Sequence, residues 1–494
     1  MDPMRPPLAL GTLLALAALR LALHTLTNGQ YGFHRDELAF LADARHLDWC
    51  FPAYPAFTPL VARLGLVLFG AAPAGVRLFA ALAQCGVMLL SGMMARELGG
   101  GRRAQVLAAV AVSVSPVALM AGHLFQYVSF DLFWCVLLSW VALRLLLTGD
   151  PRWLVAAGVV AGLGLNTRYT IAWMTSGLLA GILATPARRL LWNRWLWAGA
   201  AAAIVLITPV LVWQWRHDWL ALEFTRAMHE RDVRIGRTDG FLWKQLFVPA
   251  HLFTAPLWLA GLWFYLRRGE GRAVRSLGWG FLATLALYAL SQARDYYTAP
   301  LYPMLLAAGA VAAAGWRTCA WRAQWAALAV ALITGWALIV PAAPAGSRWF
   351  YKVVSLNGDL AEEVGWPEFV AQVAQVHRAL PEAERGRAGL LASNYGEAGA
   401  LGLYGPALGL PPVMGRTNSF WLRGYDPREP GTVIVTGMSA ENAQRYFEAC
   451  EWKATITNSL GVRNEESSDA RYILVCRGPR EPWAELWRRL RQWS

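Results

Sequence analysis

Two adjacent carboxylates, Asp36 and Glu37, stand in the run Phe33-His34-Arg35-Asp36-Glu37-Leu38, just after the first long apolar segment. Neighbouring side chains on a helix point in different directions, so we expect the two carboxylates to have different functions. One could act as a general base in a partly desolvated cleft, and the other could orient a neighbour or bind an acceptor. The alternative is that both carboxylates only stabilise the N-terminus of a helix.

The elements that position these carboxylates are membrane helices. The sequence of 494 residues is 56% hydrophobic and only 16% charged, whereas a soluble domain carries roughly 25% charged residues. A spanning helix needs about 20 mostly apolar residues. We predict about eleven such helices, at residues 8–27, 75–97, 104–122, 130–148, 152–166, 169–185, 195–214, 246–266, 274–291, 297–315 and 322–341.

The basic residues predict how these helices are oriented. Every second turn between them is rich in arginine, as cytoplasmic turns are. With the N-terminus in the cytoplasm, an odd number of helices places residues 342–494 outside, and we expect a bacterial inner membrane. This topology explains the net charge of +13 better than binding to nucleic acid does.

Two domains follow from the pattern. Residues 1–344 form the membrane domain, with long outer loops at 28–74 and 215–245, the second of which could form a lid. Residues 345–494 read as a soluble α/β domain. Its strands are expected at 386–393, 432–436 and 472–476, and its helices at 397–408 and 440–449. Cys450 and Cys476 could form a disulfide if this domain lies outside the cytoplasm.

Several motifs of the chain, taken in order, resemble one family. In the membrane domain they are Asp36-Glu37-Leu38, Gly122-His123-Leu124-Phe125 with Asp131 after it, and Arg294-Asp295-Tyr296-Tyr297 followed by Pro300 and Tyr302-Pro303. In the soluble domain they are Asn394-Tyr395-Gly396-Glu397-Ala398, Leu403-Tyr404-Gly405 and Leu410-Pro411-Pro412. The combination resembles glycosyltransferase family 39, which includes the protein O-mannosyltransferases and the aminoarabinose transferase of lipid A.

The resemblance implies a GT-C fold and a sugar donor linked to polyprenyl phosphate. It also implies inverting transfer to a glycan, lipid or protein acceptor on the outer face of the membrane. Asp36 would then deprotonate the acceptor hydroxyl, and Glu37 would orient the acceptor or a neighbouring cation. A lipid phosphate becomes a good leaving group once cations neutralise its charge.

The donor phosphate therefore needs cations near the outer headgroup plane. Arg294 follows an expected helix at that level, beside Tyr296 and Tyr297, and Arg168 lies between two short expected helices. Arginine suits bidentate phosphate binding. The alternative for each arginine is that it only extends its charge to the membrane surface and has no chemical role.

Asp131 and His123 are candidates for the acceptor site or for its support. Asp131 could pair with a loop cation or shape the acceptor site, and its alternative role is a helix N-cap. His123 alone is more typical of a buried, hydrogen-bonded histidine. Related bacterial proteins usually carry Asp-His-Pro-Pro in the first loop, where this chain has Ala53-Tyr54-Pro55-Ala56. A different substrate, an absent metal and weak activity are all open explanations, and the sequence itself supports no metal site or other cofactor.

Two other functions remain as alternatives. A transporter or flippase of lipid-linked glycans would also place charges at membrane depth, but it predicts internal repeats and paired broken helices, and the sequence shows neither. An inactive carbohydrate-binding protein could keep the same fold. No P-loop is present to bind a nucleotide. The expected partners are the lipid-linked sugar, its acceptor and membrane lipids.

Overall fold

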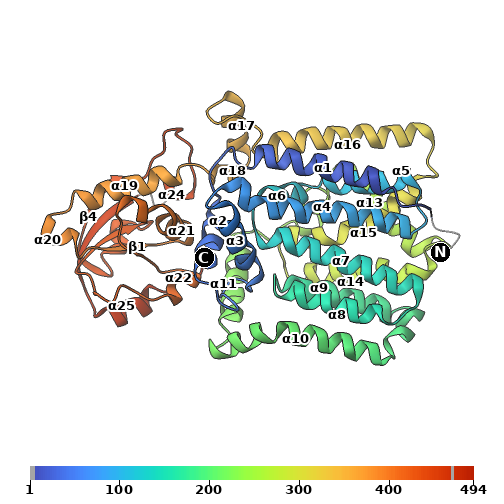
Figure 1. Cartoon of the computed structure of the whole chain (residues 1–494), viewed down its shortest axis with the longest axis horizontal. Helices are drawn as coiled ribbons and strands as arrows, with labels where there is room; N and C mark the ends of the chain where they lie inside the picture. Colours follow the sequence, from blue (N-terminus) through green and yellow to red (C-terminus); the bar gives the residue numbers. More distant parts are fainter. Residues whose placement is uncertain (1–5, 469–471) are drawn as a thin grey trace.

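The computed structural model describes residues 6–468 and 472–494 and consists of a helical bundle with a smaller sheet domain at one end (Figure 1). Each of the segments expected to span the membrane contains a helix of the bundle. These helices are α1 (Leu10–Thr27), α4 (Pro73–Glu97), α5 (Arg102–Ser113), α6 (Pro116–His123), α7 (Tyr127–Thr148), α8 (Trp153–Leu165), α9 (Thr170–Leu183), α10 (Arg194–Arg216), α13 (Ala255–Arg267), α14 (Arg275–Leu290), α15 (Tyr302–Ala313) and α16 (Thr318–Ile339).

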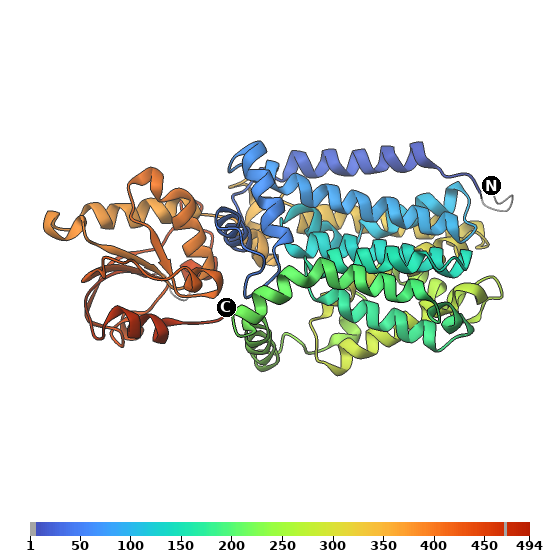
Figure 2. The ribbon, with the colours of Figure 1, turned by 60° about the horizontal axis from the view of Figure 1, so that its bottom comes forward.

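The helices differ in how far they can reach across a bilayer. In the described residues, six helices are long and apolar enough to cross a membrane, and the bent pair α5 and α6 makes up to seven. The helices α8, α9, α13 and α15 have 12 to 14 residues. At 1.5 Å per residue they are roughly 20 Å long, shorter than the hydrocarbon core of about 30 Å. They nevertheless run alongside the long helices within the bundle (Figures 1 and 2).

Two expected helix boundaries are wrong, and proline explains both. The helix expected at 104–122 is broken into α5 and α6, which meet at 70°. Pro116 lacks the N–H needed to continue α5, and Ser115 caps the new helix by accepting from the N–H of Ala118. The helix expected at 246–266 begins only at Ala255, because Pro249 lacks the N–H for a helical hydrogen bond and the chain before α13 forms only a turn and the 3₁₀ helix η2 (Leu252–Thr254). Pro256 stands in the first turn of α13, where proline is tolerated.

Short helices cover the end of the bundle that faces the soluble domain (Figure 1). They are α2 (Arg35–Arg45), α3 (Phe57–Phe69), α11 (Leu220–Arg234), α12 (Phe241–Lys244) and the 3₁₀ helix η4 (Asp295–Leu301). The first two lie in the loop 28–74 and the next two in the loop 215–245, both of which were expected on the outer side. Beyond α16, α17 (Arg348–Leu356) and α18 (Gly358–Ala361) connect the bundle to the sheet domain.

The soluble domain has one mixed sheet with helices on both faces (Figure 1). Its strands are β1 (Gly389–Ala392), β2 (Val413–Gly415), β3 (Thr432–Thr436), β4 (Phe447–Thr455) and β5 (Tyr472–Pro479), in the order β2-β1-β3-β5-β4. The first three are parallel, and β5 is antiparallel to β3 and β4. Side chains alternate between the faces, so Ile434 packs toward α19 (Trp366–Arg378) and α21 (Tyr395–Tyr404), while Val433 and Val435 pack toward α25 (Trp483–Leu490).

One helix expected in this domain is mostly wrong. Residues 440–449 were expected as a helix, but α23 covers only Ala440–Ala443, and β4 begins at Phe447. The tertiary pairing of β4 with β5 overrides the local helical preference there. Cys450 lies opposite Cys476 in that pair, and the two are joined by a disulfide.

The soluble domain packs directly on the membrane domain through α21 and α2. A Cβ added at Gly399 would lie 2.7 Å from the carbonyl of Leu38, so only glycine allows the two helices to come this close. A single buried cluster runs from Leu38 and Phe40 of α2 to Ile434 and Val475 of the sheet. The soluble domain therefore forms a fixed wall above the carboxylates of α2.

Glu397, in the first turn of α21, makes the stability of the protein depend on pH. Burial raises its pKa to about 7, while its side chain accepts from the hydroxyl of Thr436 and the N–H of Ser393. A carboxyl whose pKa is raised by folding stabilises the folded state at low pH, and this contribution is lost as pH rises from the unfolded pKa to the folded one. We expect wild type to lose roughly 3 kcal/mol between pH 4.5 and pH 7 relative to Glu397→Gln, measured by thermal denaturation. A difference between the two proteins that does not change with pH would contradict this role.

Candidate functional site

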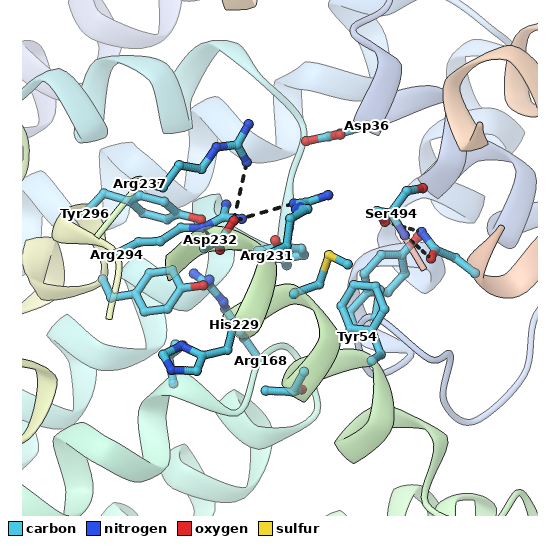
Figure 3. Close-up of a pocket in the computed structure, with 18 of the residues that line it drawn as sticks. Asp36, Tyr54, Arg168, His229, Arg231, Asp232, Arg237, Arg294, Tyr296 and Ser494 are labelled. Atoms are coloured by element: carbon cyan, nitrogen blue, oxygen red, sulfur yellow. Dashed lines mark hydrogen bonds and ion pairs between the residues drawn. The ribbon is translucent and has the colours of Figure 1, made fainter. Parts of the chain in front are cut away.

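A cavity of about 1190 Å³ lies where the bundle meets the soluble domain. Its walls come from α2, α11, η4, the turn between α8 and α9, and, on the other side, α18, α21, α22 (Asn418–Leu422) and α24 (Glu465–Ser468). Figure 3 shows arginines gathered in its centre, with Asp36 on the neighbouring wall. Of the predicted residues, the cavity brings together Asp36, Arg168, Arg294, Tyr296 and Tyr297.

Asp36 is held by hydrogen bonds on both of its oxygens. Its Oδ1 accepts from the hydroxyl of Tyr395 at 2.7 Å, and its Oδ2 accepts from Nε2 of Gln126 at 3.0 Å. The side chain keeps 36% of its surface exposed, so the carboxylate can still receive a proton from a bound molecule. Tyr395 comes from the soluble domain and Gln126 from the start of α7, so both domains fix this one carboxylate.

His34 precedes Asp36 and caps α2. Its Nδ1 accepts from the backbone N–H of Asp36 at 3.1 Å, so that nitrogen carries no proton. The Nε2 atom is buried and has no hydrogen-bond partner among the described residues. His34 thus positions the start of α2.

Arg168 lies in a cage of tyrosine rings. Its guanidinium carbon is 4.3 Å from the ring centroid of Tyr297, 4.6 Å from that of Tyr127 and 5.7 Å from that of Tyr296. Within the described residues its guanidinium makes no hydrogen bond, and its ion pair with Asp131 is long, at 3.9 Å. Cation–π contacts hold the cation while leaving its N–H groups available. Burial raises the pKa of Tyr297 to about 12, so that phenol stays neutral.

Arg294 is part of a cluster around one carboxylate on α11. Its Nε and Nη2 bind Asp232 at 2.5 and 2.8 Å, and Arg231 and Arg237 each approach the same carboxylate at 3.6 Å. Figure 3 shows these side chains converging on Asp232. Three cations share one acid, so the cluster has a positive charge in excess. The sequence suggested the loop 215–245 as a lid but did not single out these residues of α11.

Glu37, predicted to orient the acceptor or a neighbouring cation, lies outside the cavity. Its Oε1 and Oε2 accept from Arg77 at 2.8 and 2.6 Å, and both side chains are fully buried. Oε1 also accepts from the N–H of Phe125, and Oε2 from the N–H of His34, which completes the capping box of α2. The alternative role at the helix N-terminus therefore fits Glu37, and the cation it orients is Arg77.

Asp131 and His123 also lie outside the cavity, in supporting positions. Asp131 accepts from the hydroxyl of Thr170 at 2.8 Å and faces Arg168 from behind, which orients that arginine. His123 is buried between Glu363, at 2.5 Å from its Nε2, and Asn28, at 3.1 Å from its Nδ1. It is a buried, hydrogen-bonded histidine, as the simpler interpretation of the sequence has it.

Tyr54 lies in the stretch Ala53-Tyr54-Pro55-Ala56, where this chain lacks the acid that related proteins carry in the first loop. It lines the cavity, and its hydroxyl donates to Oδ2 of Asp43 at 2.7 Å. Asp43 is fully buried and also accepts from Ser419 at 2.7 Å and from Arg423, both in the soluble domain. Burial raises the pKa of Asp43. Within residues 6–468 and 472–494, no three His, Cys, Asp or Glu side chains are placed to hold a metal ion.

The membrane domain is similar in sequence to one known family. Residues 54–213 match the family model described as dolichyl-phosphate-mannose-protein mannosyltransferase. The resemblance expected from the motifs is therefore confirmed over this segment. No curated protein sequence matches the chain.

The structure is similar to those of two membrane glycosyltransferases. ArnT from Cupriavidus metallidurans bound to undecaprenyl phosphate matches with a TM-score of 0.61 and 15% identity, over 94% of this chain and 98% of that one. Its apo state gives the same TM-score and coverage at 16% identity. A mutant of the mycobacterial arabinofuranosyltransferase AftD matches with a TM-score of 0.50 and 16% identity, over 96% of this chain and 42% of that one. At these identities the likeness concerns the fold, and the chain has the GT-C fold that the sequence predicted.

Proposed function

We propose that this protein transfers a sugar from a polyprenyl-phosphate donor to an acceptor hydroxyl, with inversion at the anomeric carbon. The observation that carries the proposal is the cavity itself, which holds a partly exposed and hydrogen-bonded carboxylate, Asp36, together with caged and clustered arginines. Deprotonating a hydroxyl requires a base, and releasing a phosphate requires cations. Both requirements are met on the walls of a single cavity.

In this mechanism Asp36 takes the proton of the acceptor hydroxyl as the oxygen attacks the anomeric carbon. The bond from that carbon to the phosphate oxygen breaks, and the polyprenyl phosphate leaves from the opposite side of the sugar. Tyr395 and Gln126 orient Asp36 through the two hydrogen bonds on its oxygens. A single displacement of this kind uses one carboxylate and inverts the configuration.

Arg168 and Arg294 bind the phosphate of the donor. Among the residues that the structure describes, the guanidinium of Arg168 makes no hydrogen bond, whereas Arg294 must exchange its carboxylate partner Asp232 for the phosphate. This exchange conserves a bidentate ion pair, because a phosphate offers the same two-oxygen geometry as a carboxylate. The neighbouring phenols of Tyr296 and Tyr297 donate to the remaining phosphate oxygens.

The donor class is supported by the likeness to ArnT bound to undecaprenyl phosphate. The acceptor approaches from the opposite wall, which the soluble domain forms with Tyr395, Asn418 and Glu465. This placement makes the soluble domain the part that selects the acceptor, be it a glycan, a lipid or a protein. The reaction takes place on the outer face of the inner membrane, where the basic turns place the soluble domain.

The proposal is tested with purified protein and a pool of polyprenyl-phosphate sugars extracted from membranes. Mass spectrometry measures the free polyprenyl phosphate released when an acceptor extract is added. We expect release that depends on both the protein and the acceptor. A lipid-linked sugar that stays intact, or that only crosses between the leaflets of a vesicle, would instead support the flippase alternative. Saturable binding of sugar without release would support the inactive carbohydrate-binding protein.

Arg168→Gln is expected to weaken donor binding because it removes the caged cation. A charge-assisted contact to phosphate contributes about 1.5–3 kcal/mol, so the KM for the donor should rise by roughly 10- to 100-fold. Arg168→Lys keeps the charge but loses the bidentate geometry, so its KM for the donor should lie between those of wild type and Arg168→Gln. Donor titrations of the three proteins measure the effect. An unchanged KM in Arg168→Gln would mean that other residues bind the donor phosphate.

A further inference from the structure

A second cavity, of about 630 Å³, is lined by residues near the N-terminal ends of α1, α5 and α16. Figure 1 shows these helix ends on the side of the bundle away from the soluble domain. The cavity is formed between the first turns of α1, α5 and α16, and we refer to it as the α1–α5–α16 cavity. Its lining includes Arg102 and Arg103 of α5, Arg322 and the half-buried Trp321 and Trp325 of α16, and Thr12 of α1. None of these residues takes part in the reaction proposed above.

The charge of this cavity is one-sided. No acidic side chain lines it, and within the described residues Arg102, Arg103 and Arg322 form no ion pair or hydrogen bond through their side chains. In the other cavity, by contrast, Arg231, Arg237 and Arg294 converge on Asp232. Three cations on one concave surface, none of them paired within the part of the chain that the structure describes, favour an anion with several acceptor oxygens.

The backbone adds donors to the same surface. Arg102 and Thr318 are the first residues of α5 and α16, and neither helix has a side chain that caps its N-terminus. Their first N–H groups are therefore available to an anion. Gln105 fixes the wall between α1 and α5, since its side chain accepts from the N–H of Ala9 and donates to the carbonyls of Pro7 and Gly100. The cavity is thus held in shape before anything binds.

The position of the cavity identifies the kind of anion. α1 and α16 carry exposed apolar side chains, as expected for helices that face lipid. Leu10 at the start of α1 is 51% exposed, and Ile333, about three turns along α16 from Arg322, is 70% exposed. Trp321 and Trp325 are of the type that collects at headgroup level, and their rings pack edge to face. An anion with an apolar tail can bind the arginines with its charged group and pack its tail against the exposed apolar side chains of α1 and α16. A free anion makes only the first of these contacts.

We propose that the α1–α5–α16 cavity binds the phosphate headgroup of an anionic membrane lipid, whose acyl chains lie along α1 and α16. Basic turns on one side of a membrane protein also arise from topology alone, without any binding. Arg188, Arg189 and Arg194 form such a turn between α9 and α10, where they are exposed and line neither of the two cavities described. They are a matched control of equal charge.

The test is native mass spectrometry of the full-length protein in detergent, titrated with phosphatidylglycerol or phosphatidylcholine. We expect wild type to bind phosphatidylglycerol in preference to phosphatidylcholine. The triple variant Arg102→Gln, Arg103→Gln, Arg322→Gln should bind phosphatidylglycerol roughly 100-fold more weakly, at about 1 kcal/mol per basic residue. The control variant Arg188→Gln, Arg189→Gln, Arg194→Gln should bind it like wild type. Melting temperatures without added lipid establish that both variants are folded.

Three results would overturn the proposal. Equal losses in both triple variants would mean that only overall charge attracts the lipid. Unchanged binding in the cavity variant would place the lipid elsewhere. If glycerol 3-phosphate raises the melting temperature as much as phosphatidylglycerol does, the cavity binds free phosphate and the lipid assignment is wrong.

Discussion

Asp36→Asn is expected to abolish sugar transfer while leaving donor binding intact. A positioned general base contributes about 10²- to 10⁴-fold to a rate, and asparagine cannot accept the proton of the acceptor hydroxyl. The amide has the same shape, its Oδ1 can still accept from Tyr395, and Gln126 can turn its side chain so that its oxygen accepts from the new Nδ2. The measurement is a single-turnover rate with saturating donor, together with the affinity for polyprenyl phosphate.

Two further variants show whether the loss of transfer in Asp36→Asn comes from the missing base. Tyr395→Phe removes only the hydrogen bond to Oδ1 of Asp36 and should lower the rate by about tenfold, since it perturbs a positioned base without removing it. Asp239→Asn makes the same chemical change at an exposed position outside the cavity and serves as the control. A rate for Asp36→Asn equal to that of Asp239→Asn would exclude Asp36 as the base. Asp43, the other carboxylate of α2 on this cavity, would then be the next candidate.

Glu37→Gln is expected to destabilise the protein by about 3–5 kcal/mol, whereas Asp36→Asn at the neighbouring position is not expected to destabilise it. The substitution removes the charge that pairs with Arg77 in a site from which water is excluded. Arg77 is left with Glu363, at 3.3 Å, as its remaining charged partner. The effect should appear as a large drop in melting temperature in detergent, whereas Asp36→Asn should melt close to wild type.

A double variant separates a broken ion pair from other causes of instability. Combining Glu37→Gln with Arg77→Met removes both charges, so its cost should be clearly smaller than the sum of the two single costs. Additive costs would show that the two residues do not interact. If Glu37→Gln is as stable as wild type but no longer transfers sugar, Glu37 takes part in the reaction itself.

Much of the fold could be predicted because membrane helices are encoded locally. About 20 apolar residues in a row and arginine-rich turns are visible in any single sequence, and they located each helix of the bundle. The ends of the helices depended on prolines such as Pro116 and Pro249, whose effect a hydropathy pattern does not register. β4 was missed because its pairing with β5 is a long-range contact that local preference cannot show.

The candidate site could be predicted only in part. Asp36, Arg168 and Arg294 stand out as charges at the expected membrane surface, and the structure places all three on one cavity. That Asp36 and Glu37 have different surroundings could be expected, because neighbouring side chains on a helix point in different directions. Which of them faces the cavity depends on Arg77, forty positions along the chain, which binds Glu37. Asp232 and Tyr395 come from α11 and from the separate sheet domain, so only the tertiary structure brings them to the site.

The most direct test of the central claim is the fate and configuration of the sugar after a single turnover. Purified protein would be given a ¹³C-labelled polyprenyl-phosphate sugar pool and an acceptor extract, and NMR would read the anomeric signal of the labelled product. The mechanism with Asp36 as the only base predicts that the label moves to the acceptor with inverted configuration. Retained configuration would require a covalent intermediate on a second carboxylate, and label that stays on the polyprenyl phosphate would mean that no transfer occurs; either result would contradict the claim.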